Sequence, residues 1–121
     1  MTTTLTTIHD RITCVLADVA PQAITERLAM LVWELDDLDY SIGNAIANVY
    51  RSADRLQAAH EARQSLDFDA RQLLGNQRTL SDRIADRETK VQLIMQLVGV
   101  LHTMTGTDPA ALRSAVFGSA S

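Results

Sequence analysis

The chain has 121 residues and a mass of 13.3 kDa, which suits one domain rather than two. Hydrophobic residues make up 46% of it, against five glycines, two prolines and 4% aromatic residues, a composition that disfavours wholesale disorder and turn-rich β-sandwiches or barrels. The formal net charge of −4 argues against a strongly basic nucleic-acid-binding domain.

The first predicted element is a helix from about Thr4 to Val19. Its apolar residues recur at intervals of three and four, as on one face of a helix: Leu5, Ile8, Ile12, Val15, Leu16 and Val19. Pro21 then either ends this helix or opens the next one as a first-turn proline.

The second predicted helix runs from about Ile24 to Arg63 without an interior proline. Its apolar positions alternate steps of three and four over several heptads, which is typical of a coiled coil: Leu28, Leu31, Leu35, Leu38, Ile42, Ala45, Val49, Leu56 and Ala59. The segment 64–67 is the natural place for the chain to reverse.

A third helix is predicted from about Leu66 to Gly106, because the heptad repeat resumes there. Gly75-Asn76 is the one place inside it where the helix could stop, since glycine suits a left-handed helix end. Thr107-Asp108 supplies a cap for a short last helix from Pro109 to about Val116.

The two long helices fit an antiparallel hairpin in which Leu28 faces Leu101 and Leu35 faces Ile94. Nearly every facing pair is apolar. The predicted polar core layers are Ser52 opposite Gln77 and Ile42 opposite Arg87, and such layers fix register and partner number at some loss of stability.

The end of the hairpin that contains residues 28–33 and 91–101 is apolar on more than one face. One seam cannot bury that surface, so we expect the first and last helices to cover it. The predicted fold is therefore all-α: a long coiled-coil-like hairpin with short terminal helices at its base, resembling a four-helix bundle, in one domain over 1–121 with flexible ends at 1–4 and 118–121.

Toward the turn, residues 51–90 carry eight basic and seven acidic side chains. The core positions of the heptads there include the small or polar residues Ala, Ser and Gln. A two-helix tip of this kind is marginal alone, so we expect a second chain to pack along it, as in a symmetric homodimer. The candidate interface residues are Leu28, Val32, Trp33, Tyr40, Ile46, Tyr50, Leu93 and Leu97.

The run from Glu34 to Asp39 is the most distinctive cluster of chemical groups. Its carboxylates, three residues apart, suit a divalent cation or general acid-base work, or simply a solvated helix face. The facing stretch 91–96 offers Val, Gln, Leu, Ile, Met and Gln, which are not metal ligands. We therefore assign no catalytic, cofactor-binding or metal-binding residue and expect no cofactor.

Compartment signals are few. Cys14 is the single cysteine, so no internal disulfide can form, which favours a reducing compartment. The stretch 91–104 is the most apolar one and falls short of the roughly 20 residues that cross a bilayer. We expect a cytoplasmic protein without a membrane span.

Three functions are considered. The first is a non-enzymatic helical interaction module: a small homo-oligomeric adaptor, chaperone or assembly component of a secretion system or virion, which binds itself and another protein. The second is a nucleic-acid-associated regulator that uses the arginines near the turn, disfavoured because acidic residues are interleaved with them. The third is a small all-helical enzyme that uses the carboxylates of 34–39.

Overall fold

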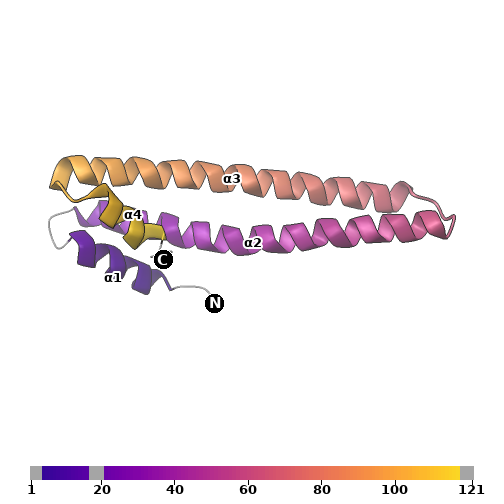
Figure 1. Ribbon diagram of the computed structural model, residues 1–121, viewed down its shortest axis with the longest axis horizontal. Helices are drawn as coiled ribbons and strands as arrows, with labels where there is room; N and C mark the ends of the chain where they lie inside the picture. The colour runs from indigo at the N-terminus through magenta and orange to yellow at the C-terminus, as the bar shows by residue number, and fades with distance from the viewer. Residues whose placement is uncertain (1–3, 17–20, 118–121) are drawn as a thin grey trace. The chain divides into compact units, whose positions relative to one another are not determined.

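The computed structural model describes residues 4–16 and 21–117, and this part of the chain is all-α (Figure 1). Its helices are α1 (Leu5–Leu16), α2 (Gln22–Glu61), α3 (Asp67–Thr105) and α4 (Pro109–Phe117). The long helices α2 and α3 pack antiparallel, and the short terminal helices pack against them. The predicted helical hairpin with terminal helices is thus confirmed.

The chain divides into two compact units that share the long helices. The four-helix unit consists of residues 1–37 and 88–121, and the hairpin unit consists of residues 38–87. Because α2 and α3 contribute to both units, a single domain over 1–121 stays a prediction.

Local capping explains where the short helices begin. The Thr4 hydroxyl accepts a hydrogen bond from the Thr7 backbone N–H at 3.2 Å, which caps α1. Asp108 caps α4 in the same way through the Ala110 N–H at 3.1 Å, as its position before Pro109 predicts. Thr4, expected at a flexible end, therefore has a defined role. The other expected flexible residues, and Val19 at the expected end of the first helix, lie outside the described residues.

The third helix is continuous through Gly75 and Asn76, so the possible break there does not occur. It ends at Thr105, where Gly106 takes a left-handed backbone with φ of 71° and its N–H bonds to the His102 carbonyl at 2.9 Å. This is the glycine helix end that the sequence predicts.

The turn between the long helices is built around Arg63 rather than a glycine. Arg63 has φ of 57°, the Gln64 N–H bonds to the Ala59 carbonyl at 2.9 Å, and the Arg63 N–H bonds to the His60 carbonyl at 3.1 Å. This pair of bonds is the Schellman motif, in which the left-handed residue is usually glycine. The helix thus ends at Glu61, two residues before the predicted end.

Replacing Arg63 with glycine is expected to raise the free energy of unfolding by about 1 kcal/mol, because a side chain in the left-handed region costs about 1–2 kcal/mol. Urea denaturation followed by circular dichroism measures the change. Arg55→Gly is the matched control: Arg55 lies exposed inside α2, where glycine should instead lower stability by about 1 kcal/mol. A loss of stability in Arg63→Gly would contradict the turn geometry.

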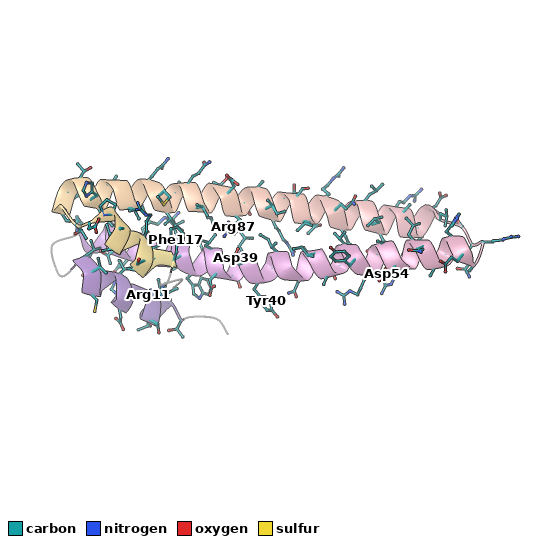
Figure 2. The ribbon with its side chains drawn as sticks, viewed as in Figure 1. Arg11, Asp39, Tyr40, Asp54, Arg87 and Phe117 are labelled. Carbon is teal, nitrogen blue, oxygen red and sulfur yellow. The ribbon has the colours of Figure 1, made fainter. Side chains whose placement is uncertain are left out.

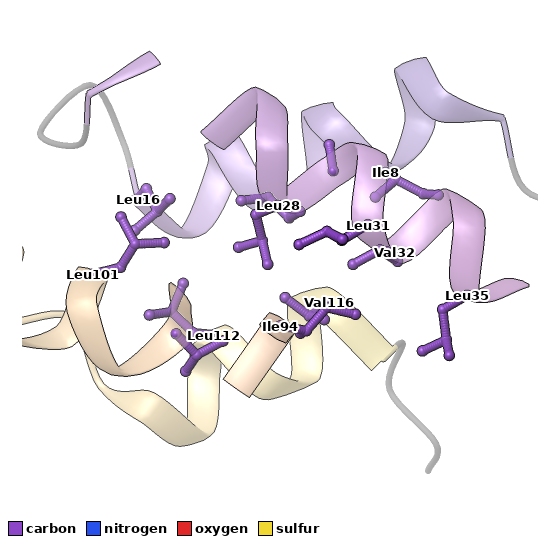
Figure 3. Close-up of a cluster of buried hydrophobic side chains, with 13 residues drawn as sticks. Ile8, Leu16, Leu28, Leu31, Val32, Leu35, Ile94, Leu101, Leu112 and Val116 are labelled. Atoms are coloured by element: carbon purple, nitrogen blue, oxygen red, sulfur yellow. The ribbon is translucent and has the colours of Figure 1, made fainter. Parts of the chain in front are cut away.

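The core of the described chain lies in the four-helix unit (Figure 3). Each of the four helices contributes buried aliphatic side chains to one cluster, among them Ile8 and Ile12 of α1, Leu28 and Leu31 of α2, Ile94 and Leu101 of α3, and Leu112 and Val116 of α4. Helices α1 and α4 therefore cover part of the apolar surface that one helix seam could not bury, while Trp33, Leu93 and Val100 stay exposed.

The hairpin unit has a much smaller core. Its buried residues are Ala45, Ser52 and Ala59, all on α2 and all small. By contrast, its exposed large hydrophobic residues include Tyr40, Tyr50, Phe68, Leu74 and Ile84. The large apolar residues of its seam are half-buried: Leu38, Ile42, Val49, Leu56, Leu73 and Leu80. Because stability follows the apolar area removed from water, this unit gains less from its seam than a fully buried core would give.

Candidate functional site

The structure divides the predicted interface residues into two groups. Leu28 and Val32 are buried in the core of the four-helix unit, and Leu97 is half-buried against that core. Leu28 and Val32 are therefore corrected from interface to core, because the short helices already cover them. The remaining five are exposed: Trp33, Tyr40, Ile46, Tyr50 and Leu93.

Polar contacts bridge one side of the α2–α3 seam at heptad intervals. In the hairpin unit, Arg83 Nη1 donates to the Ser41 carbonyl at 3.1 Å, and Asn76 Nδ2 lies 3.5 Å from the Asn48 carbonyl. In the four-helix unit, Lys90 Nζ lies 3.0 Å from Glu34 Oε2. The bridging residues are seven apart on each helix, so they fall in one heptad column.

The opposite side of the seam in the hairpin unit exposes large apolar residues beside a few polar ones. Among the polar ones is Asp39, which pairs with Arg87 and lies seven residues before Ile46. On α2, the seam residues Ala45 and Ser52 separate the column of Ser41 and Asn48 from the column of Ile46 and Ala53. Ile46 is 40% exposed. Tyr50, one turn further along α2, extends the same face.

Helix α3 shows the same asymmetry. Asn76 and Arg83 form the polar bridges, and the next residue after each, Gln77 and Ile84, lies on the other flank of the seam. Ile84 is 48% exposed, and Leu74, three residues before Gln77, is 64% exposed. We call the surface that contains Ile46, Tyr50, Leu74 and Ile84 the apolar side of the hairpin unit.

The polar layers differ from those expected. Ser52 is buried, as a seam residue should be, but its hydroxyl pairs with Asn76 and not with Gln77. Gln77 and Arg87 are exposed, which corrects their assignment to the core. The Arg87 side chain is long enough to place its guanidinium at the surface against the Asp39 carboxylate (Figure 2). A one-residue offset on α3 places Asn76 instead of Gln77 beside Ser52.

The Ser52–Asn76 bond is expected to contribute about 1 kcal/mol to stability, because it satisfies a buried hydroxyl. A double-mutant cycle with Ser52→Ala, Asn76→Ala and the double variant should therefore show a coupling free energy of that size in urea denaturation. Gln77→Ala, an exposed neighbour, serves as the control. Strictly additive single effects would show that the two side chains do not stabilise one another.

Two carboxylates of the acidic run carry cationic partners. Glu34 pairs with Lys90 in the four-helix unit, and Asp39 pairs with Arg87 in the hairpin unit. A metal ion would have to displace these partners. Within residues 4–16 and 21–117, no group of three or more His, Cys, Asp or Glu side chains is placed to hold a metal ion.

Charge is distributed unevenly between the units. Residues 38–87 contain seven arginines and seven aspartates or glutamates, so the hairpin unit has no net charge. The four-helix unit carries the whole formal charge of −4. Any partner that binds the hairpin unit is therefore selected by shape and apolar contact more than by net charge.

Comparison with known protein families, with curated proteins and with solved structures finds no match to this chain. In the described part of the chain, no helix combines the length and the apolar character that crossing a bilayer requires.

Proposed function

We propose that this protein is a non-enzymatic helical interaction module, a small homo-oligomeric adaptor, chaperone or assembly component that binds other proteins through its helices. The observation that carries the proposal is the composition of the hairpin unit: its fully buried residues are small, its large seam residues are only half-buried, and seven other large apolar residues are exposed, namely Tyr40, Ile46, Tyr50, Leu66, Phe68, Leu74 and Ile84. Exposed apolar surface beyond scattered single residues is typical of binding sites between proteins.

The four-helix unit supports the same function. It has a complete aliphatic core contributed by all four helices, so it can fold around its own residues. It still exposes the predicted interface residues Trp33 and Leu93, and also Val100 and Met104 on α3. Tryptophan and methionine are enriched at protein interfaces. An assembly component needs a part that folds by itself and a surface that binds a partner. The core of the four-helix unit and the exposed apolar residues of the hairpin unit match these two needs.

The interaction module is preferred to the other two functions on specific contacts. For a nucleic-acid regulator, the arginines would need to be available to phosphates, but Arg83 and Arg87 bind groups of the same hairpin and the unit has no net charge. For an enzyme, Glu34 and Asp39 would need to act on a ligand, and each is paired with a cation.

Sedimentation equilibrium over about 1–100 µM tests the proposal. The expected result is a mass that is a multiple of 13.3 kDa and falls with dilution. Circular dichroism of the same samples should show a loss of helical signal on dilution, because the hairpin unit is stabilised by its partner. A monomer of unchanged helicity over the whole range would contradict homo-oligomerisation.

A further inference from the structure

We propose that the groove between α1 and α2 in the four-helix unit binds a basic amphipathic helix of another protein. The partner helix places apolar side chains in the groove and a lysine or arginine at each end of it. This inference rests on the proposed function and names the chemistry of a partner. It concerns one groove, so it can fail while the interaction function stands.

The groove between α1 and α2 has a volume of about 390 Å³. Helix α1 contributes Leu5 and His9 to its lining, and α2 contributes Glu26, Ala29 and Met30. Ala29 is buried, whereas Leu5 and Met30 are 37% and 36% exposed, so the groove presents apolar surface to solvent. Binding sites in proteins typically span about 300–1,000 Å³ and combine an apolar lining with a few polar groups. The groove therefore has room for the apolar side chains of a docked segment.

One face of α2 sets the pattern that a partner must match. Four exposed residues lie on this face at steps of four, three and four positions: Glu26, Met30, Trp33 and Asp37. Two large apolar side chains thus stand between two carboxylates. A helix that docks in a groove presents its apolar residues at the same spacing. The complementary helix therefore carries two apolar residues between two basic ones, over three turns or about 16 Å.

The carboxylates on this face lack a cationic partner. Glu26 Oε1 accepts a hydrogen bond from Gln22 Nε2 at 3.1 Å, but that amide is neutral. In the part of the chain that the structure describes, neither Glu26 nor Asp37 forms an ion pair. Arg11 of α1 donates instead to carbonyl groups of α4, and Arg27 lies about 100° around α2 from Glu26. A lysine or arginine at each end of a docked helix would supply the missing cations.

This pattern selects another protein as the occupant, not a second copy. The complement requires two basic residues eleven positions apart, and no two lysines or arginines in the sequence have that spacing. The arginines of the hairpin unit are also interleaved with as many acidic residues. The four-helix unit carries a net charge of −4, which attracts a basic partner and repels an identical unit.

A designed peptide tests the groove. The probe has about 14 residues, with two leucines three positions apart, a lysine four positions outside each leucine, and alanine and glutamine elsewhere. Trp33 is the single tryptophan of the chain, so its fluorescence reports binding at this face. At about 150 mM salt, which screens long-range attraction, we expect a dissociation constant of about 10–100 µM and a shift of Trp33 emission to shorter wavelength. A peptide with glutamates in place of both lysines should bind at least tenfold more weakly.

Charge reversal in the protein tests the two carboxylates. Glu26→Lys with Asp37→Lys should weaken binding of the lysine peptide at least tenfold and make the glutamate peptide the tighter ligand. Asp54→Lys with Glu88→Lys is the matched control: it changes the net charge equally at exposed positions that do not line the groove, and the dissociation constant should stay within about threefold. Equal weakening by the two variants would overturn the proposal, because the attraction would then follow net charge alone.

Truncation of apolar side chains tests the lining. Leu5→Ala with Met30→Ala should raise the dissociation constant of the lysine peptide at least tenfold, because it removes apolar surface that the leucines would cover. Val100→Ala with Met104→Ala removes exposed apolar side chains of α3 outside this groove and should leave the constant within about threefold. Circular dichroism should show wild-type helicity in both variants, since alanine is a good helix former. An unchanged constant in the groove variant contradicts docking at this site.

The outcomes separate this inference from the proposed function. Absence of binding by the lysine peptide at about 1 mM overturns the groove proposal, and sedimentation of the wild type decides homo-oligomerisation independently. A monomeric wild type that binds the peptide at Trp33 supports the groove and contradicts homo-oligomerisation. Binding without a change in Trp33 emission places the peptide elsewhere and overturns the proposal. A Trp33 emission that shifts on dilution of the protein alone, without peptide binding, would identify a second copy as the occupant and overturn the choice of partner.

Discussion

Replacing Ile12 with alanine is expected to lower the free energy of unfolding by about 2–5 kcal/mol. Ile12 lies in α1, is 0% exposed and belongs to the cluster that joins all four helices of the four-helix unit. Truncation removes three methyl or methylene groups from this cluster and leaves a cavity that rigid neighbouring helices fill only in part. Domains of this size are stable by about 5–15 kcal/mol, so the loss is a large fraction.

The measurement is urea denaturation followed by circular dichroism, with wild type and variant at the same protein concentration because association also affects stability. Leu5→Ala is the matched control. Leu5 lies at the start of the same helix and is 37% exposed, so its truncation should cost less than about 1 kcal/mol. Equal losses for the two variants would show that α1 is not packed into the core through Ile12.

Much of the fold could be predicted because the heptad repeat is long. Steps of three and four residues continue from Leu28 to Ala59 and again from Leu73 to Leu101, and a single short segment joins the two runs. Antiparallel packing is then the geometry that buries both stripes. Helix-capping and helix-terminating residues predict where two helices begin or end. Pro109 after Asp108 opens α4, and Gly106 ends α3.

The turn was harder to place, because Arg63 gives no sequence signal for a left-handed residue. A Gly at that position would have marked the end of α2. The bonds from Gln64 and Arg63 back into the helix compensate for the strained backbone, and they depend on three-dimensional geometry rather than on side-chain identity.

Which flank of the seam is polar also could not be predicted from the heptads alone. A one-residue offset on α3 decides whether Asn76 or Gln77 faces Ser52, and both are polar amides with similar propensity. The same offset carries Arg83 onto the Ser41 carbonyl and leaves Ile84 exposed. A repeated polar column of Asn76, Arg83 and Lys90, seven apart, is the signal that could have indicated the offset.

The contact made by Arg11 was missed for a different reason. It joins residues that are more than one hundred positions apart, and an arginine on an amphipathic helix looks like an ordinary surface residue. In the structure its Nε donates to the Ala115 carbonyl and its Nη2 donates to the Val116 carbonyl at 3.3 Å. The guanidinium of α1 thus satisfies carbonyl groups at the C-terminal end of α4.

Arg11→Ala is therefore expected to lower the free energy of unfolding by about 2 kcal/mol, because hydrogen bonds to a charged donor each contribute about 1.5–3 kcal/mol and the site is only part-buried. Helix α4 has nine residues and is too short to be stable in isolation, so it depends on its core contacts and on this cation at its negative end. Arg11→Lys should lose about half as much, since lysine keeps the charge but lacks the planar fork that reaches two carbonyls.

Arg113→Ala provides the control: it removes an exposed arginine from α4 itself, with an expected change within about 0.5 kcal/mol. Hydrogen exchange adds a local measurement. If Arg11 holds α4 in place, amides in Pro109–Phe117 of Arg11→Ala should exchange faster than those of wild type, and amides in the hairpin unit should not change. Equal stabilities and equal α4 protection in the Arg11 and Arg113 variants would show that the core alone fixes α4, and that the guanidinium contact follows from its packing rather than causing it.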